Sequence, residues 1–198
     1  FHSDVRTVFA AASLRSLAAS LGASAAAPFR APPNGIPAGC ERIVPDMLPL
    51  AALSQQEIDS IVEQVPGGAA NVQDIYPLAP LQEGILFHHL MNADSDPYIM
   101  PILLSVASRP QLDAFIDALQ QVLNRHDVLR TAVVARSLSM PVQVVARNVD
   151  LPVNWVQLDP ARDAAAQCAA WLTGQHRMDL SQAPLLHVRV AQHPHTPA

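Results

Sequence analysis

The sequence predicts an α/β domain in which helices and strands form layers, and three observations lead to this assignment. Between residues 72 and 191, segments with helical periodicity alternate with short segments rich in β-branched residues. Half of the 198 residues are hydrophobic, which is enough to form a core. Six prolines lie between residues 28 and 49, ahead of this region, where they exclude a long helix.

The first part of the chain, residues 1–22, is predicted to form one or two short helices. Leucines fall at helical spacing between Ser13, a predicted N-cap, and Gly22, a predicted C-cap. Helices of this size cannot bury a core alone, so we expect them to be the end of a larger domain.

Residues 23–71 are predicted to form an interdomain linker with one helix. The prolines favour an extended, semi-rigid backbone, and the apolar side chains between them suggest that it lies along the surface of the following domain. Ser54 and Glu57 have the spacing of a capping box, which predicts a helix over residues 55–65. The run Pro66-Gly67-Gly68 ends that helix.

The α/β part, residues 72–198, begins with a short strand at 74–76 and a helix over 81–91. Apolar residues cover nearly the whole circumference of this helix, which is typical of a buried helix. It ends in His88 and His89, with two aspartates just beyond. Histidine is the side chain that changes charge most easily near neutral pH, so this end is a candidate site.

The rest of this part alternates between helix and strand patterns. In chain order the sequence predicts a strand over 98–107, a helix over 111–124, strands over 129–134, 142–146 and 153–158, a helix from Asp159-Pro160 to about residue 176, and a strand over 185–191.

Composition and charge exclude several function classes. The net charge is −5 and no basic stripe occurs, which argues against nucleic-acid binding. No apolar run approaches the roughly 20 residues of a membrane span, and the first residues lack a signal peptide, so we expect a cytoplasmic protein. All twelve cations are arginine, which we attribute to coding bias in a GC-rich bacterium. Cys40 and Cys168 are expected to be free thiols.

The stretch YPLAPLQEGILFHHL at the start of the α/β part resembles the opening motif of condensation domains in nonribosomal peptide synthetases. His88-His89-Leu90, four residues and then Ser95-Asp96 resemble the HH[I/L]xxxxGD pattern of the dual epimerization/condensation subtype, with Ser95 in place of glycine. The resemblance implies epimerization of a carrier-bound donor residue, followed by peptide bond formation with a downstream aminoacyl carrier. It makes His88 and His89 candidate epimerization bases and Asp96 a supporting residue.

A second stretch, NRHDVLRTAV at residues 124–133, resembles the RHExLRTxF motif of the same family. Asp127 stands in the glutamate position and Val133 in the phenylalanine position. The resemblance implies that Arg130 holds the catalytic loop in place, with Arg125 and His126 beside it. From the residues alone, Arg130 is expected to be an ion-pair partner, since a buried arginine without an acid is costly.

The family's central motif, HHxxxDG, does not occur in the sequence, which closes with QHPHTPA. The resemblance therefore implies the N-terminal half of a chloramphenicol-acetyltransferase-like condensation domain, in a fragment cut at both ends and without condensation activity. Within residues 1–22, the string VRTVFAAASLRSLAASL resembles the closing helices of a peptidyl carrier domain. Within residues 23–71, the run PPNGIPAGCERIVPDMLPL resembles linkers that precede dual condensation domains. The implied partners are upstream and downstream carrier domains with their phosphopantetheine arms, and the C-terminal half of the domain. No cofactor is expected to bind the chain directly.

Three alternatives stay open at this stage. The histidine pair could cap the helix C-terminus, where the helix dipole favours cations. The chain could belong to a plain condensation domain that accepts a D-residue donor, or to a non-catalytic module that docks carriers. A metal site would use His88, His89, Asp94 and Asp96, or the later His187, His193 and His195, but the i, i+4 spacing of helical zinc ligands does not occur, so we expect no metal.

Overall fold

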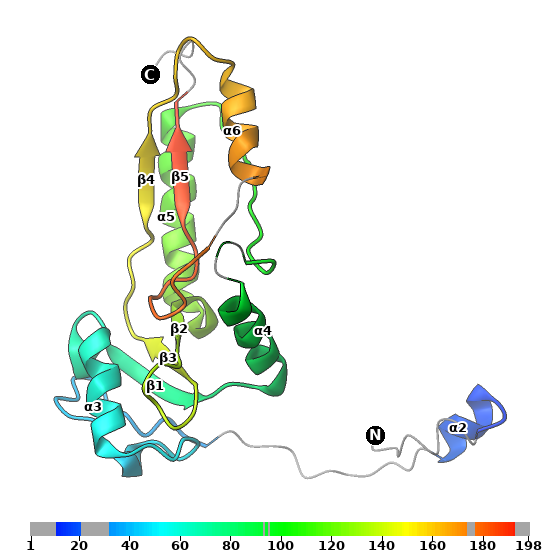
Figure 1. Cartoon of the computed structure of the whole chain (residues 1–198), viewed down its shortest axis with the longest axis vertical. Helices are drawn as coiled ribbons and strands as arrows, with labels where there is room; N and C mark the ends of the chain where they lie inside the picture. Colours follow the sequence, from blue (N-terminus) through cyan, green and yellow to red (C-terminus); the bar gives the residue numbers. More distant parts are fainter. Residues whose placement is uncertain (1–10, 21–31, 93, 95, 174–176, 193–198) are drawn as a thin grey trace. The chain divides into compact units, whose positions relative to one another are not determined.

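The computed structural model describes residues 11–20, 32–92, 94, 96–173 and 177–192. The chain divides into two units, Phe1–Pro33 and Asn34–Ala198 (Figure 1). In the first unit, helix α2 spans Leu14–Ser20. The hydroxyl of Ser13 accepts a hydrogen bond from the Ser16 N–H at 3.2 Å, which confirms Ser13 as the N-cap. The predicted helical turns before Ala11 lie outside the described residues.

The second unit begins with the segment that sequence analysis assigned to the linker. It contains a 3₁₀ turn, Pro45–Met47, then helix α3, Gln55–Gln64, and a second 3₁₀ turn, Gly68–Asn71. The capping box of α3 is confirmed, because the Glu57 N–H donates to Ser54 Oγ and Glu57 Oε2 accepts from the Ser54 N–H. Gly67 follows the helix with a φ of 85°, a left-handed conformation that favours glycine.

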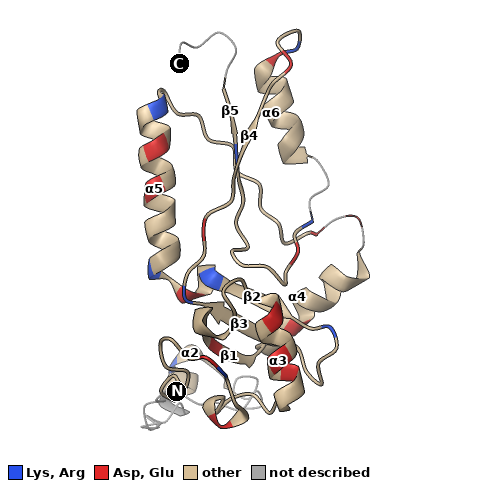
Figure 2. Cartoon of the chain, turned by 90° about the vertical axis from the view of Figure 1, so that its left-hand side faces the viewer, with Lys and Arg blue, Asp and Glu red and all other residues tan. Residues whose placement is uncertain are grey.

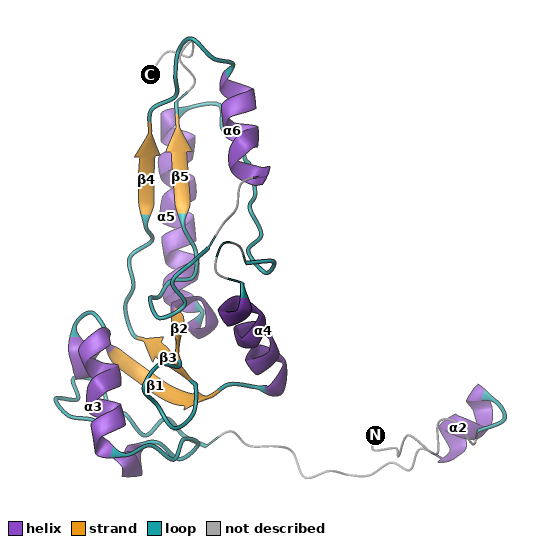
Figure 3. Ribbon diagram, viewed as in Figure 1, coloured by secondary structure: helices purple, strands orange, loops and turns teal. Residues whose placement is uncertain are grey.

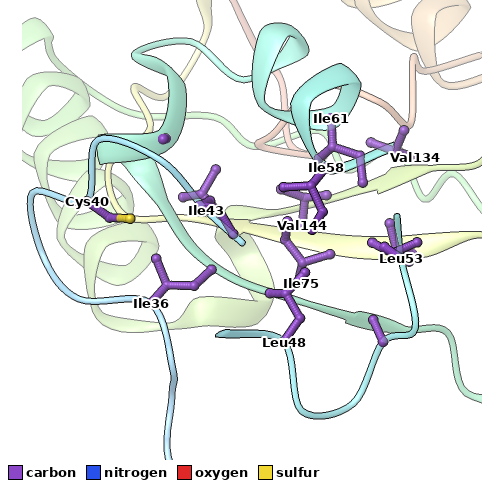
Figure 4. Packing of buried hydrophobic residues seen from close by; sticks show 14 residues of the cluster. Ile36, Cys40, Ile43, Leu48, Leu53, Ile58, Ile61, Ile75, Val134 and Val144 are labelled. Atoms are coloured by element: carbon purple, nitrogen blue, oxygen red, sulfur yellow. The ribbon is translucent and has the colours of Figure 1, made fainter. Parts of the chain in front are cut away.

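This segment supplies much of the hydrophobic core (Figure 4). Its side chains pack with strand residues of the α/β part around the fully buried Ile58 and Ile61 of α3. Residues 34–71 therefore pack along the following domain, as their apolar side chains suggest, and belong to the same unit as the sheet. The cluster consists of Ile36, Cys40, Ile43, Leu48, Ala51, Leu53, Ile58, Ile61, Ala69, Val72, Ile75, Val134, Val142 and Val144.

Two small sheets organise the remaining chain (Figure 3). The first is antiparallel in the order β1-β3-β2, with β1 Val72–Pro77, β2 Thr131–Val134 and β3 Val142–Ala146. All five residues of β3, the central strand, are buried, as expected for a strand covered on both faces. The second sheet pairs β4, Val153–Val156, with β5, Val188–Ala191, in parallel.

Helix α4 spans Pro80–Met91, but the prediction that it is buried all round is wrong. Only Leu86 and His89 are buried, whereas Leu81 and Met91 are 77% and 68% exposed. In Figure 2 this helix is almost entirely tan, because Glu83 is its only Lys, Arg, Asp or Glu residue. Apolar composition does not produce burial here because nothing in the described part of the chain packs against the rest of the helix surface.

The predicted strand over residues 98–107 is also wrong. This segment is irregular, and Met100 and Ile102 are more than three-quarters exposed (Figure 3). A β-branched, apolar sequence becomes a strand only when a neighbouring strand satisfies its backbone hydrogen bonds. No strand within the described ranges pairs with it.

Helix α5, Arg109–Arg125, begins two residues before its predicted start, because Ser108 caps it and Pro110 occupies the first turn. Arg109 lies 4.4 Å over the ring of Trp155, which ties the start of α5 to β4. A 3₁₀ turn, Asp127–Arg130, connects α5 to β2. Helix α6, Ala164–Thr173, starts later than predicted because the carboxylate of Asp163 accepts the N–H of the third helical residue.

Two further observations concern the chain as a whole. Cys40 and Cys168 are both free, as predicted. Among the described residues, no helix is long and apolar enough to span a membrane.

Candidate functional site

The C-terminal end of α4 carries a buried histidine–carboxylate pair. His89 Nδ1 lies 2.7 Å from Asp96 Oδ2, and the two residues are 6% and 9% exposed. Helix α4 positions His89, because Leu86 and His89 are the only buried residues of this helix. A turn positions Asp96, whose second carboxylate oxygen accepts the Tyr98 N–H at 2.9 Å. His89 and Asp96, which are seven positions apart in the motif, are thus in direct contact.

The electrostatics of Asp96 decide which nitrogen of His89 carries the proton. Burial acts to raise the pKa of Asp96, but the Tyr98 N–H, the hydrogen bond and charge of His89, and the charge of Arg177 outweigh burial and lower it. Asp96 is therefore a carboxylate near neutral pH and can only accept a hydrogen bond. His89 consequently donates from Nδ1, and in the neutral imidazole the lone pair is on Nε2.

His88 has different surroundings. It is exposed, its Nδ1 lies 2.7 Å from the hydroxyl of Tyr98, and the two rings stack at 5.9 Å with an interplanar angle of 8°. The adjacent histidines thus have different partners, as expected from the 100° between successive helical residues. Tyr98 contacts both halves of the site, since its N–H binds Asp96 and its hydroxyl binds His88.

Arg177 also belongs to this site, although it is far away in sequence. Its Nη1 donates to the backbone carbonyl of His89 at 2.9 Å and to the carbonyl of Asn92. Asn92 is the C-cap of α4, so Arg177 binds carbonyl groups that have no partner inside the helix.

The second predicted group surrounds Arg130, whose side chain is 5% exposed. Its guanidinium donates to the carbonyls of Leu123, Ala146 and Arg147, and it also binds the side chains of Gln73 and Asp127. It therefore joins the end of α5 to β1 and β3, and Asp127, the residue in the motif's glutamate position, is its ion-pair partner.

Two titratable groups of β1 have shifted pKa values. Burial raises the pKa of Asp74, and the charge of Asp127 acts in the same direction. Burial likewise raises the pKa of Tyr76, which lies in β1 beside them. Gln73 Nε2 donates to Asp127 Oδ2 at 2.8 Å and so links the strand to this carboxylate. The Arg130 group is thus a packed polar connection between α5 and β1.

The other predicted site residues contribute less. Arg125 and His126 are exposed, and the His126 N–H caps the end of α5 by donating to the Val122 carbonyl. No hydrogen bond or ion pair within the described ranges joins the Arg130 group to the His89 group. Ser95 lies outside the described residues, as do His193 and His195. In the part that the structure describes, no three His, Cys, Asp or Glu side chains are placed to hold a metal ion.

Sequence reasoning missed Arg177 and Tyr98. The segment containing Arg177 showed no motif, and its contacts join residues 85 and 88 positions apart, a distance that no local pattern reveals. Tyr98 lies in the segment 98–107, where the sequence predicts a strand, and that prediction gives it no role in the turn after α4.

Comparisons with known proteins agree with this architecture. The family model described as "Condensation domain" matches residues 72–196. The chain is 49% identical over 191 residues to malpinin synthetase of Mortierella alpina and 46% identical over 191 residues to malpibaldin synthetase of the same organism; each match covers 96% of this chain. It is 37% identical over 148 residues, 71% of this chain, to a linear gramicidin synthase of Brevibacillus parabrevis.

The chain spans only about 2–3% of the length of these curated relatives. The first two are from a fungus, so they do not support the bacterial origin inferred from the absence of lysine.

A solved structure described as the crystal structure of CT is similar in fold, with a TM-score of 0.50 at 18% identity, over 75% of this chain and 33% of that chain. The α/β fold is that of part of a condensation domain, which confirms the predicted chloramphenicol-acetyltransferase-like class. The family match covers residues 72–196 of the α/β part and includes the His89 and Arg130 groups. The relatives are synthetases of malpinin and malpibaldin and a synthase of linear gramicidin. The chain therefore belongs to the condensation domain family of nonribosomal peptide synthetases.

Proposed function

We propose that this condensation domain is of the dual kind, which first epimerizes the donor residue and then joins it to the acceptor. The observation that carries the proposal is the buried contact of 2.7 Å between His89 Nδ1 and Asp96 Oδ2, within the sequence pattern of the dual subtype. A histidine that only capped the helix would need no buried carboxylate on its ring.

The contact gives His89 the properties of a general base. Epimerization requires removal of the Cα proton next to the carrier-bound thioester and return of a proton to the opposite face. With Nδ1–H held by Asp96, the lone pair on Nε2 is available to accept that proton, and the carboxylate stabilises the imidazolium that forms. Asp96 thus orients the base and does not itself take the proton.

His88 has the weaker claim to this role. Its Nδ1 binds a tyrosine hydroxyl, which offers no negative charge to stabilise an imidazolium near neutral pH. We therefore assign the role of base to His89 and not to His88, which forms a hydrogen bond with Tyr98 beside it.

The substrates of this reaction are carried by other domains. In the complete enzyme, phosphopantetheine arms of upstream and downstream carrier domains present the donor peptide and the acceptor aminoacyl group as thioesters. Arg130 holds the end of α5 against the β1-β3-β2 sheet and so supports the architecture around the donor side. The 198-residue chain alone does not form peptide bonds, because its sequence lacks the HHxxxDG motif. Incubation with donor and acceptor thioesters on carriers tests this, and turnover would contradict it.

The experiment that tests the proposal replaces the two histidines separately in the complete module. The His89→Gln module is expected to give product with an L-configured donor residue, or to require a supplied D-configured donor, while condensation is retained. The His88→Gln module is the matched control and keeps the D-configured product. Unchanged stereochemistry in both variants would contradict the proposal and favour a plain condensation domain. Loss of D-product only in His88→Gln would move the base to His88.

A further inference from the structure

The turn after α4 is held at its start by Arg177. The carbonyls of His89 and Asn92 belong to the end of α4, and both accept from Arg177 Nη1. Asn92 also binds back to the helix, since its side-chain Nδ2 donates to the His88 carbonyl at 3.1 Å. A cation at a helix C-terminus is favoured by the dipole as well as by these hydrogen bonds.

The other end of the same turn is held by Asp96 itself. Its Oδ1 accepts the Tyr98 N–H at 2.9 Å, and its Oδ2 faces His89. Asp96 lies only four residues after the C-cap Asn92, so its contact with His89 depends on where the turn starts. Arg177 sets that starting point from a different part of the chain.

The charges around the turn after α4 also favour the contact between Asp96 and His89. The positive charge of Arg177 is among the influences that keep Asp96 ionised. Asp179, two residues further along, has a lowered pKa, chiefly through its hydrogen bonds with Ser181 and in smaller part through the charges of Arg136 and His89. Arg177 and Asp179 thus lie close together in sequence, and Arg177 acts electrostatically on Asp96 while His89 acts on Asp179.

We propose that Arg177 is a positioning residue for the His89–Asp96 pair: it fixes the end of α4 and the start of the following turn, and so keeps the Asp96 carboxylate on His89 Nδ1. This inference rests on the proposed function for its relevance to epimerization. The contact it predicts can be measured without any activity.

The test is nuclear magnetic resonance of the 198-residue chain labelled with ¹⁵N-histidine. The wild-type spectrum is expected to show a slowly exchanging His89 Nδ1–H. Arg177→Met removes the donors and the charge, and the His89 Nδ1–H signal is expected to be lost. Arg177→Lys keeps a cation that can donate to the carbonyls and is expected to retain the signal. Arg42→Met, which removes an exposed arginine 3.6 Å from Asp59, is the matched control and leaves the signal unchanged.

Backbone amide signals of β3, recorded on a second sample labelled uniformly with ¹⁵N, report whether each variant is folded. If Arg177→Met does not fold, Arg177→Gln is measured instead. Glutamine keeps a donor but has no charge, so the His89 Nδ1–H signal is expected to weaken, and an unchanged signal would count against the inference. A folded Arg177→Met chain with an unchanged His89 Nδ1–H signal would overturn the inference. Rescue by Arg177→Lys separates positioning from a general loss of stability.

Activity of the complete module separates this inference from the proposed function. The Arg177→Met module is expected to exchange the donor Cα hydrogen more slowly, while it still condenses a supplied D-configured donor. If the ring signal is lost but Cα exchange in the module is unchanged, Arg177 does position the pair, and the assignment of His89 as the base fails.

Discussion

Replacing Arg130 by methionine tests how much the buried guanidinium stabilises the fold. Its side chain is 5% exposed and donates to three backbone carbonyls and two side chains. Methionine fills similar space but donates nothing, so the Leu123 and Ala146 carbonyls lose this donor in a buried setting. Each buried polar group left without a partner costs about 1–3 kcal/mol. Asp127 is 56% exposed and can be solvated again, so it contributes little.

The two buried carbonyls together predict a loss of about 2–6 kcal/mol in the free energy of unfolding. Domains of this kind have stabilities of roughly 5–15 kcal/mol, so the variant would be near the limit of folding. With a slope of about 2 kcal/mol per molar urea, the unfolding midpoint falls by about 2 M. Urea titration followed by circular dichroism measures it.

Arg125→Met is the matched control from the same motif. Arg125 is exposed at the end of α5, and its replacement should change stability by less than about 0.5 kcal/mol. If Arg130→Met loses less than about 1 kcal/mol, or no more than Arg125→Met, the guanidinium is not the connection between α5 and the sheet that we describe.

Three further predictions follow from the core, the α3 cap and the site. Ile61→Ala should lower stability by about 2–5 kcal/mol in chemical denaturation, because Ile61 is fully buried in the core that residues 34–71 share with the sheet; a loss below about 1 kcal/mol would mean that this segment only lies on the surface. The backbone hydrogen bond from Ser139 is the largest of the causes that lower the pKa of Glu57 from its ordinary value of 4.5 to about 2. This carboxylate therefore stabilises the fold at a pH above 4.5, and the contribution is lost as the pH falls toward 2. Glu57→Gln should therefore be less stable than wild type at pH 7, with the difference disappearing in acid melts; a difference that grows in acid would contradict this. Asp96→Asn should favour the other tautomer of His89 and slow donor Cα exchange in the complete module by on the order of 10³–10⁴-fold, with condensation of a supplied D-configured donor retained; exchange at the wild-type rate would contradict the role of the carboxylate.

Local signals in the sequence predicted local structure well. The capping box of Ser54 and Glu57 and the strand pattern of residues 142–146 each depend on residues within a few positions, and α3 and β3 form close to where they were expected. The strand over 142–146 has the predicted bounds because both its neighbours, β1 and β2, are present.

Non-local features were not predictable in the same way. The apolar surface of α4 and the segment 98–107 had the composition of buried elements, but burial depends on what packs against them, which no local window contains. The apolar side chains of the predicted linker, residues 23–71, are expected to lie along the following domain, but their partners were not predictable for the same reason, since Ile58 and Ile61 meet strands from further along the chain.

The candidate site contains both a local feature that the sequence predicts and non-local features that it does not. The spacing from His89 to Asp96 was visible as a motif, and the structure places the two side chains in contact. The role of Arg177 could not be predicted from the sequence, because it depends on a contact with His89, which lies 88 positions earlier in the chain. The distinction between His88 and His89 likewise required the structure, because it depends on which ring is buried.

The most direct test of the account is the fate of the donor Cα hydrogen in deuterated water. The complete module is loaded with an L-configured donor on the upstream carrier, and the donor thioester is released and analysed by mass spectrometry before condensation. We predict that the wild-type module incorporates one deuterium at Cα and that the His89→Gln module incorporates none, while the His88→Gln module behaves as wild type. Deuterium incorporation at the wild-type rate in His89→Gln would contradict the assignment of His89 and Asp96 as the epimerization base and its orienting carboxylate.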